Sequence, residues 1–463
     1  MMRPEDHMIP GGANADIRPL THGEGGLAWE GVAFDTLAEE FGSPLYVTSF
    51  PALRATTDSL RSALACSGLE GRLAFAVKAN PVPGILGALV GQDVGLVVMS
   101  GHELHLALAV GVHRANIIVH GLSRHRDLAE TAVFAHAGLI VAECLEDLAL
   151  LERTASRARL PVEVALRVSP GLKRSRFFKV GGPGPAGFRP DSEDLETGLL
   201  MLSRSPYLRL NALSFHVGTG LSEASLYRRA LLASRSVWRE SLAQGLRPAV
   251  LDIGGGFGLS HVRTHTPGQL LASLLLQRGR APRPGPTATS LMHQAGLAVK
   301  EVFAPLGEDG PRMIVAEPGR ALVGPCQHLV VTVQSLGIRN GRRYAICDGG
   351  AMSLSPLLLG ERHRIEPISG SGARTALYDL VGNTPAPLDL IASGVRLPVL
   401  HPGDRLLIRD VGAYFSCLGT NFSGPRPGIV GLDGERAFEL RPAETFDHIF
   451  GHDTWTSRTQ LVP

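Results

Sequence analysis

The chain has 463 residues, 44% of them hydrophobic and 19% charged, so it can bury a large core and is long enough for two or three domains. A formal net charge of +2 is too small to steer nucleic acid to the surface. No apolar run reaches membrane-spanning length, and acids, prolines and glycines occupy residues 1–20, where a signal peptide needs an unbroken apolar stretch. The five cysteines lie far apart without a CxxC pair, which is typical of a reducing compartment. We therefore expect a cytoplasmic protein with no nucleic-acid or membrane partner.

After a Gly-rich lead-in at residues 1–25, short apolar runs alternate with longer amphipathic stretches, which is the pattern of repeated strand–helix units. Helical patterns occur at 101–110, at 224–241 and from residue 290 onward. A (β/α)8 barrel over residues 49–325 matches the number and spacing of the apolar runs, and a doubly wound sheet is the competing arrangement. The eight predicted strands are 73–77, 94–99, 116–120, 139–142, 162–168, 210–216, 249–253 and 313–317.

From about residue 328 the pattern changes to β-like runs separated by Gly, Pro and Asp turns, with little helix between them. This predicts a second, all-β domain over residues 326–445, followed by a tail at 446–463. We expect residues 26–48 to pair with this domain, although they precede the first barrel strand. The Pro- and Arg-rich residues 278–288 predict an exposed insertion.

Two motifs directly follow predicted strands, and in a barrel the C-terminal ends of the strands are where a ligand binds. The motif FAVKAN places the amine of Lys78 at the barrel mouth, partly desolvated, where it can form a Schiff base. The motif LDIGGGFG contains Gly254, Gly255 and Gly256, whose backbone N–H groups can approach a phosphate closely. A strand-end lysine and a tight turn are the ordinary structural explanations of these motifs.

Two further motifs stand at strand ends. In AEPGR, the carboxylate of Glu317 could keep a pyridine nitrogen protonated, and Arg320 could meet a phosphate or carboxylate with two hydrogen bonds. In SFHVGTG, the imidazole of His216 lies at another strand end. A surface ion pair and a structural histidine are the alternatives.

Together, these motifs resemble those of the fold type III decarboxylases that use pyridoxal 5'-phosphate (PLP), the group of diaminopimelate, ornithine and arginine decarboxylases that shares its barrel with alanine racemase. The resemblance runs from about residue 30 to about residue 430 and includes SGHEL at 100–104, CDGG at 347–350 and DVGAY at 410–414. It implies a PLP-dependent amino-acid decarboxylase that needs no metal. By that resemblance PLP forms a Schiff base with Lys78, stacks on His216, and is held by Gly254, Gly255 and Gly256 at its phosphate and by Glu317 at its ring nitrogen.

The resemblance also implies roles for Arg320 and for Tyr414 of the β domain. Arg320 would contact the phosphate or the substrate, and Tyr414 would close over the phosphate. The family assembles head to tail with shared active sites, so a homodimer is implied in which Tyr414 serves the partner subunit.

The chain departs from the family in the segments that recognise substrate. In VGNTPAPLD, Pro385 and Ala386 replace the cysteine and the acid of the family motif GPxCxxxD, and Asp389 is retained. Arg320 and Asp389 are therefore the candidates for contact with substrate. Ser355 and Leu358 stand where diaminopimelate enzymes carry the arginine and tyrosine that hold the second carboxylate. We expect a substrate other than diaminopimelate, such as the derivatised or carrier-tethered amino acids of siderophore and antibiotic pathways.

The missing cysteine leaves open which acid returns a proton to Cα, and Cys417 and Cys347 are candidates. An amino-acid racemase or a decarboxylation-dependent transaminase on the same fold is the alternative. A non-catalytic PLP-binding homologue is a third possibility. The complete set of cofactor-binding residues argues against it.

Overall fold

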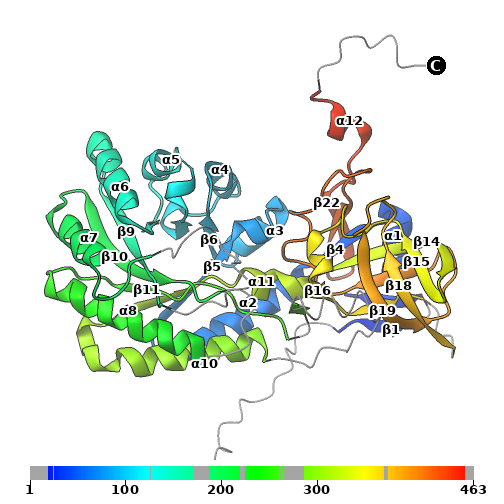
Figure 1. Ribbon diagram of the computed structural model, residues 1–463, viewed down its shortest axis with the longest axis horizontal. Coiled ribbons are helices and arrows are strands. Elements are labelled where there is room, and N and C mark those ends of the chain that lie inside the picture. The colour runs from blue at the N-terminus through cyan, green and yellow to red at the C-terminus, as the bar shows by residue number, and fades with distance from the viewer. Residues whose placement is uncertain are drawn as a thin grey trace, which may run out of the picture.

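The computed structural model describes residues 19–23, 25–125, 127–171, 187–218, 225–260, 262–264, 286–369 and 374–453 (Figure 1). The lead-in before residue 19, most of the predicted insertion (278–285) and the tail beyond residue 453 lie outside these residues.

Eight parallel strands close into a barrel in the order β10-β11-β13-β5-β6-β7-β8-β9, on the left of Figure 1. Each strand overlaps one that the sequence predicts, so the barrel prediction is confirmed. A doubly wound sheet is excluded because β13 pairs with β5 as well as with β11, which leaves no open edge. The strands are β5 (Glu70–Ala76), β6 (Gly95–Val98), β7 (Ile117–Val119), β8 (Leu139–Ala142), β9 (Val162–Val168), β10 (Leu208–Phe215), β11 (Val250–Asp252) and β13 (Met313–Ala316).

Helices surround the barrel, and four of them begin at a polar cap. Ser49, Ser100, Ser192 and Thr287 each accept a backbone N–H bond in the first turn of the helix that follows. No helix in the described part of the chain is long and apolar enough to cross a membrane. The helices are α2 (Phe50–Leu64), α3 (Pro83–Val90), α4 (Gly101–Ala109), α5 (Leu128–Phe134), α6 (Leu145–Ala158), α7 (Glu193–Arg204), α8 (Ser225–Ala243), α10 (Ala288–Phe303) and α11 (Gly319–Val323).

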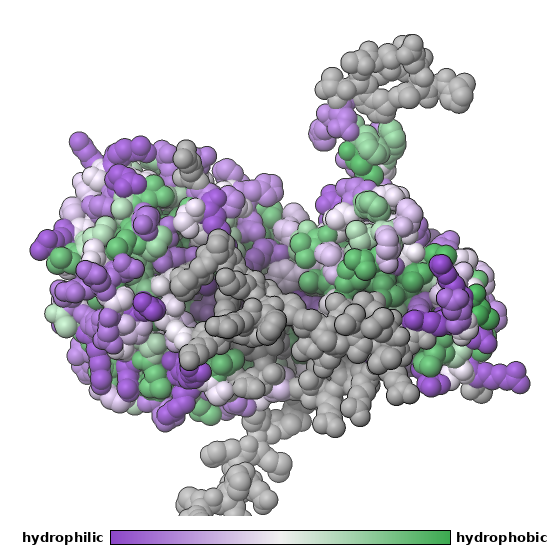
Figure 2. All heavy atoms as spheres, viewed as in Figure 1, coloured by the Kyte–Doolittle hydropathy of each residue, from purple (hydrophilic) through white to green (hydrophobic). Residues whose placement is uncertain are grey.

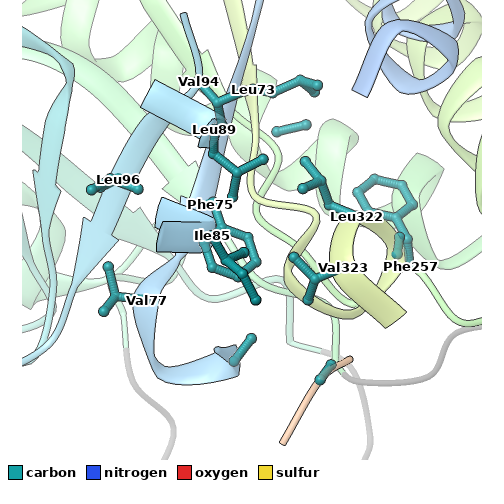
Figure 3. Packing of buried hydrophobic residues seen from close by; sticks show 14 of the residues in the cluster. Leu73, Phe75, Val77, Ile85, Leu89, Val94, Leu96, Phe257, Leu322 and Val323 are labelled. Atoms are coloured by element: carbon teal, nitrogen blue, oxygen red, sulfur yellow. The ribbon is translucent and has the colours of Figure 1, made fainter. Parts of the chain in front are cut away.

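Side chains of each barrel strand alternate between the interior and the helix layer. On β5, Ala74 and Ala76 belong to a small core inside the barrel. Leu73, Phe75 and Val77 belong to the larger core outside it. Figure 3 shows these three side chains with others contributed by α3 and α11. Packing against these two cores fixes which side chains of β5 face the barrel interior. The next inward-facing position after Ala76 is residue 78, at the mouth of the barrel.

A second sheet of nine strands forms the β-rich part of the molecule, on the right of Figure 1. The all-β prediction for this region is confirmed. β4 (Leu45–Ser49), which precedes the barrel, pairs antiparallel with β14 and parallel with β21, so the N-terminal segment is hydrogen-bonded into this sheet. The other strands are β14 (Gln327–Arg339), β15 (Arg342–Cys347), β17 (Ile365–Pro367), β18 (Thr375–Val381), β19 (Leu390–Pro398), β20 (Arg405–Ile408), β21 (Gly428–Asp433) and β22 (Arg436–Arg441).

Small elements complete the fold. β1 (Thr21–Gly23), β2 (Gly26–Trp29) and β3 (Val32–Ala33) form a three-stranded sheet that leads into α1 (Phe34–Phe41). β12 (Arg263–Thr264) pairs with β16 (Glu361–Arg362), which links the barrel to the β domain. α12 (Phe446–Phe450) ends the described chain.

Candidate active site at the barrel mouth

Residues from five strand ends meet at the mouth of the barrel, and four of them carry polar side chains. Ile118, Ala212, Val250 and Val315 line the interior of four of these strands. Because side chains alternate along a strand, the positions two or four residues further on also face inward, at the C-terminal edge. These positions, with residue 78 at the end of β5, are occupied by Lys78, His120, His216, Gly254 and Glu317.

Lys78 lies in a single 3-10 turn, Val77–Ala79, directly after β5. Its Nζ is 3.2 Å from the sulfur of Met99, a weak acceptor, and the side chain is exposed. The expected partial desolvation is therefore wrong for the isolated chain. The contact leaves the amine accessible for reaction.

Glu317 is the centre of a buried polar cluster. Its Oε1 lies 2.9 Å from Nε2 of His120, and the two side chains are 11% and 9% exposed. Side-chain donor atoms of Glu317, His120 and Asp252 all lie within 4.8 Å of one another. Asp252 accepts hydrogen bonds from the Ser214 hydroxyl at 2.7 Å and from its own loop, at Gly254 N, at 2.8 Å.

The two carboxyl groups of this cluster ionise differently. Burial raises the pKa of Asp252 well above its usual value, and the negative charge of Glu317 raises it further. Burial would also raise the pKa of Glu317, but the charge and hydrogen bond of His120 and the charges of His216 and Lys78 lower it below its usual value. Glu317 is therefore the anionic member, which suits a carboxylate that holds a pyridine nitrogen in its protonated form.

His216 directly follows β10, and its ring lies at the mouth beside the glycine loop. Burial lowers its pKa to about 4, although the charge of Glu317 acts in the opposite direction. The imidazole is thus neutral at pH 7, and a flat neutral ring at this place can stack on an aromatic cofactor.

The glycine loop after β11 passes too close to its neighbours to carry side chains. A Cβ on Gly254 would lie 2.3 Å from the Phe215 carbonyl oxygen, and one on Gly255 would lie 2.3 Å from the Glu317 carbonyl oxygen. Gly254 and Gly256 have φ of +63° and +94°, which other residues rarely adopt. Only glycine allows this backbone to run along the mouth, where its N–H groups can reach a phosphate.

Arg320 lies on α11, three residues after Glu317, but a carboxylate already holds it. Its Nη1 and Nη2 each donate to Glu361 over 2.7 Å. The Arg320 guanidinium carbon also lies 5.3 Å from the centre of the Tyr414 ring. The expected contact of Arg320 with phosphate or substrate thus competes with an existing ion pair.

Tyr414 lies at the site of its own chain. Its backbone N–H donates to the carbonyl oxygen of Ala79 at 2.8 Å, one residue after Lys78. A Cβ on Gly412 would lie 1.8 Å from the Val323 carbonyl oxygen, so this loop packs tightly on its own barrel. The expectation that Tyr414 serves a partner subunit is therefore wrong, because these contacts fix the DVGAY loop against the chain's own barrel.

Two other candidates have structural roles. Asp389 is 4% exposed, and its carboxylate accepts from the N–H groups of Met352 and Thr384 and from the Thr384 hydroxyl. The expectation that Asp389 contacts substrate is wrong, because these donors occupy its carboxylate within the β domain. Cys347 is fully buried in the β domain, and burial raises its pKa to about 12, so it is no substitute acid at the barrel mouth.

Cys417 does lie near the mouth. Its Sγ is 3.3 Å from the carbonyl oxygen of Lys78, and burial raises its pKa to about 11, so it stays a protonated thiol at pH 7. No role was expected for His120, Asp252 or Glu361 from the sequence. For His120 a signal existed, because it ends the apolar run IIVH at a predicted strand end.

The residues at the mouth fit PLP. They provide an accessible amine on Lys78, a loop at Gly254–Gly256 with no room for a Cβ at two of its positions, and an anionic carboxylate on Glu317. When bound, PLP supplies a ring that accepts the electrons left by departing CO2. Glu317 would hold the ring nitrogen, His216 would lie beside the ring, and the amine of Lys78 would stay within reach of the cofactor.

Comparison with known proteins agrees with this site. Residues 52–324 match the family described as pyridoxal-dependent decarboxylase, pyridoxal binding domain. Diaminopimelate decarboxylase of Bacillus subtilis (strain 168) is 26% identical over 423 residues, which cover 89% of this chain and 92% of that protein. The enzyme of the same name from Actinosynnema pretiosum subsp. auranticum is 29% identical and covers 88% of each chain.

Solved structures show the same fold. Diaminopimelate decarboxylase from M. jannaschii in complex with L-lysine matches with a TM-score of 0.81 at 20% identity, over 95% of this chain and 98% of that chain. Lysine/ornithine decarboxylase from Vibrio vulnificus in complex with putrescine matches with a TM-score of 0.69 at 23% identity, over 86% and 97%. The family match spans more than half of the chain and contains every strand of the barrel whose mouth carries Lys78 and Glu317, so the chain belongs to the pyridoxal-dependent decarboxylases and is a PLP-dependent amino-acid decarboxylase.

Proposed function

We propose that this enzyme removes the α-carboxylate of an amino acid other than diaminopimelate. The observation that carries the proposal is the segment after CDGG, where the resemblance places an arginine and a tyrosine for the second carboxylate. Ser355 and Leu358 take these positions and are both buried. Neither can supply the charge-assisted hydrogen bonds that a distal carboxylate needs.

The contacts of Ser355 support this reading. Its hydroxyl donates to the carbonyl oxygen of Tyr414 at 3.0 Å and accepts from the N–H of Leu357 at 3.3 Å. Both hydrogen-bonding functions of the hydroxyl are thus used within the chain. Leu358, 5% exposed, lies in the single turn Pro356–Leu359 and adds only apolar surface.

The loop between β18 and β19 also lacks the family's recognition groups. Pro385 is exposed and Ala386 is half-buried, and neither has a side-chain proton donor or a charge. We therefore propose a substrate whose side chain is larger than or different from those of diaminopimelate, lysine and ornithine, such as a derivatised amino acid of specialised metabolism.

Assembly as a homodimer is part of the same proposal. The β domain exposes large apolar side chains, among them Ile338 at 68%, Leu388 at 55% and Leu377 at 49%. In the view of Figure 2, hydrophobic residues lie among polar ones on the surface of the β domain. Exposed apolar surface of this kind favours burial against a second copy of the chain. Light scattering of the PLP-loaded protein at several concentrations tests this, and a mass of one chain at every concentration would contradict it.

The experiment that tests the activity incubates PLP-loaded protein with free amino acids, including diaminopimelate, and with acyl, citryl and carrier-linked derivatives. Products are identified by mass spectrometry, with Lys78→Ala as the inactive control. A product lighter by one CO2 from a substrate other than diaminopimelate supports the proposal. The highest kcat/KM on diaminopimelate would overturn it. Exchange of the Cα hydrogen without CO2 loss would indicate racemisation, and an aldehyde product would indicate decarboxylation-dependent transamination.

A further inference from the structure

The buried ion pair of Arg320 and Glu361 has no role in the chemistry described so far. The two side chains are 12% and 6% exposed. They form a bidentate ion pair, in which Nη1 and Nη2 of Arg320 each donate to one oxygen of the Glu361 carboxylate at 2.7 Å. Such matched pairs combine two charge-assisted hydrogen bonds and are strongly directional. A pair this well buried is also costly to open, because opening leaves two unpaired charges with little access to water.

Further contacts hold the Glu361 carboxylate in place. Glu361 begins β16, and its Oε2 lies 3.4 Å from Nε2 of His363. Nδ1 of His363 lies 2.8 Å from the carbonyl oxygen of Arg409, which orients the imidazole. Burial would raise the pKa of Glu361, but the neighbouring imidazole of His363 and the charge and hydrogen bonds of Arg320 together lower it below its usual value. Glu361 is therefore anionic at neutral pH.

The pair lies beside Tyr414, at the end of the barrel that carries Lys78. Gly319 precedes Arg320, and a Cβ on Gly319 would lie 3.8 Å from the Tyr414 hydroxyl and 3.4 Å from the Cβ of Ala79. The pKa of Tyr414, raised mainly by burial, is also influenced by the charges of Arg320, Cys417, Glu361 and Glu103. Arg320 is thus within electrostatic reach of any side chain that a substrate would extend toward Tyr414.

An unpaired arginine at this place would attract an anionic group of the substrate. With Glu361 bound to it, the pair has no net charge, and a second carboxylate would have to displace the first from both nitrogens. Glu103 adds a further acidic group nearby, whose Oε2 accepts from the N–H of Met99 at 2.7 Å. The charges around Tyr414 therefore disfavour a distal carboxylate and accept an uncharged or cationic side chain.

We propose that Glu361 is a specificity-determining residue, which neutralises Arg320 and so restricts the substrate to amino acids with an uncharged or cationic distal group. The inference rests on the proposed function in one respect, since both concern the distal end of the substrate. It goes further because it assigns the restriction to one residue and predicts how that restriction is removed.

The test uses PLP-loaded protein and pimelate, a dicarboxylate, as the probe, with binding measured by calorimetry. Glu361→Gln keeps the shape of the side chain and frees the charge of Arg320, so the Kd for pimelate should fall about tenfold or more relative to wild type. Glu444→Gln is the control, because Glu444 also accepts two guanidinium hydrogen bonds from an arginine, Arg426, although both reach its Oε1, and it lies in the β domain after β22. Its Kd for pimelate should equal that of wild type.

The Kd for PLP of the apo protein is measured on the same variants. An unchanged PLP Kd with tighter pimelate binding in Glu361→Gln supports the inference. Equal pimelate binding by wild type and Glu361→Gln overturns it, and so does tighter PLP binding with unchanged pimelate binding, because Arg320 would then serve the cofactor phosphate. Glu361→Asp, which keeps the charge but shortens the reach, should tighten pimelate binding less, and it serves as the second variant if Glu361→Gln does not fold.

The two proposals can fail separately. Product formation from diaminopimelate by wild type decides the proposed function, whatever the variants bind. The ratio of pimelate Kd values between wild type and Glu361→Gln decides the role of Glu361, whether or not the natural substrate has been found.

Discussion

Replacing His120 with leucine removes the hydrogen bond that holds the Glu317 carboxylate at the barrel mouth. The bond is 2.9 Å long and joins side chains that are about one-tenth exposed, so water replaces it poorly. Hydrogen bonds to charged groups contribute about 1.5–3 kcal/mol. Without this bond the pKa of Glu317 rises, because burial then acts with less opposition. If the full loss falls on the state that binds PLP, the Kd for PLP should rise by about 10- to 150-fold.

The assay is a titration of apo protein with PLP, followed by the visible absorbance of the bound cofactor. His120→Gln is the conservative variant, because its amide can still donate to Glu317, and it should recover most of the affinity. His401→Leu is the control for a histidine-to-leucine change away from the barrel mouth, because the His401 side chain is exposed in the β domain. This variant should bind PLP like wild type. A folded His120→Leu variant that binds PLP as tightly as wild type would refute the role of His120 in positioning Glu317.

Gly255→Ala should abolish PLP binding and lower the free energy of unfolding by about 1–3 kcal/mol, since its Cβ would lie 2.3 Å from a carbonyl oxygen. Gly87→Ala, which has open space around the added Cβ, should fold and bind PLP normally. Denaturation and PLP titrations of both variants measure this. Burial lowers the pKa of His216 to about 4 and of His328 to about 3. As the pH falls, both histidines therefore become protonated in the unfolded chain before they do so in the folded chain. The free energy of unfolding, measured by urea titration, should fall by about 2 kcal/mol per histidine between pH 6.5 and pH 5. His328→Gln should lessen that fall, and an identical fall in the variant would contradict the assignment. With its pKa near 11, Cys417 should be about one part in 3000 thiolate at pH 7.5 and resist iodoacetamide in the native protein, and rapid alkylation seen by mass spectrometry would contradict this.

The barrel could be predicted because its strands are apolar on both faces and its functional residues stand at fixed places relative to them. Lys78, His216 and Glu317 each follow an apolar run, so the C-terminal edge of the sheet brings them together whatever the loops do. The glycines at 254–256 were also readable, because close backbone approach requires them.

Contacts between distant segments could not be read from the chain. Glu361 meets Arg320 across 41 positions, and nothing in the local pattern of GERHRI indicates a buried ion pair. Asp389 matched a family motif, but a motif match does not reveal that three hydrogen bonds already occupy its carboxylate. The place of Tyr414 depends on how its loop packs on the barrel, which is again a long-range property.

The residues that we expect to bind PLP and those that we expect to set substrate specificity lie on different parts of the fold. The residues that hold PLP stand on the ends of barrel strands, whose positions are fixed by the packing of the whole barrel. The groups that we propose to face the substrate's distal end belong to loops around CDGG and β16. Their polar side chains bond within the chain, Ser355 to the backbone of Tyr414 and Glu361 to Arg320. A substitution in these loops therefore changes the charge presented to substrate without moving Lys78 or Glu317. For this reason we expect Glu361→Gln to bind pimelate more tightly while its affinity for PLP stays the same. Loss of affinity for both PLP and pimelate would show that the β16 loop and the strand ends do not act independently.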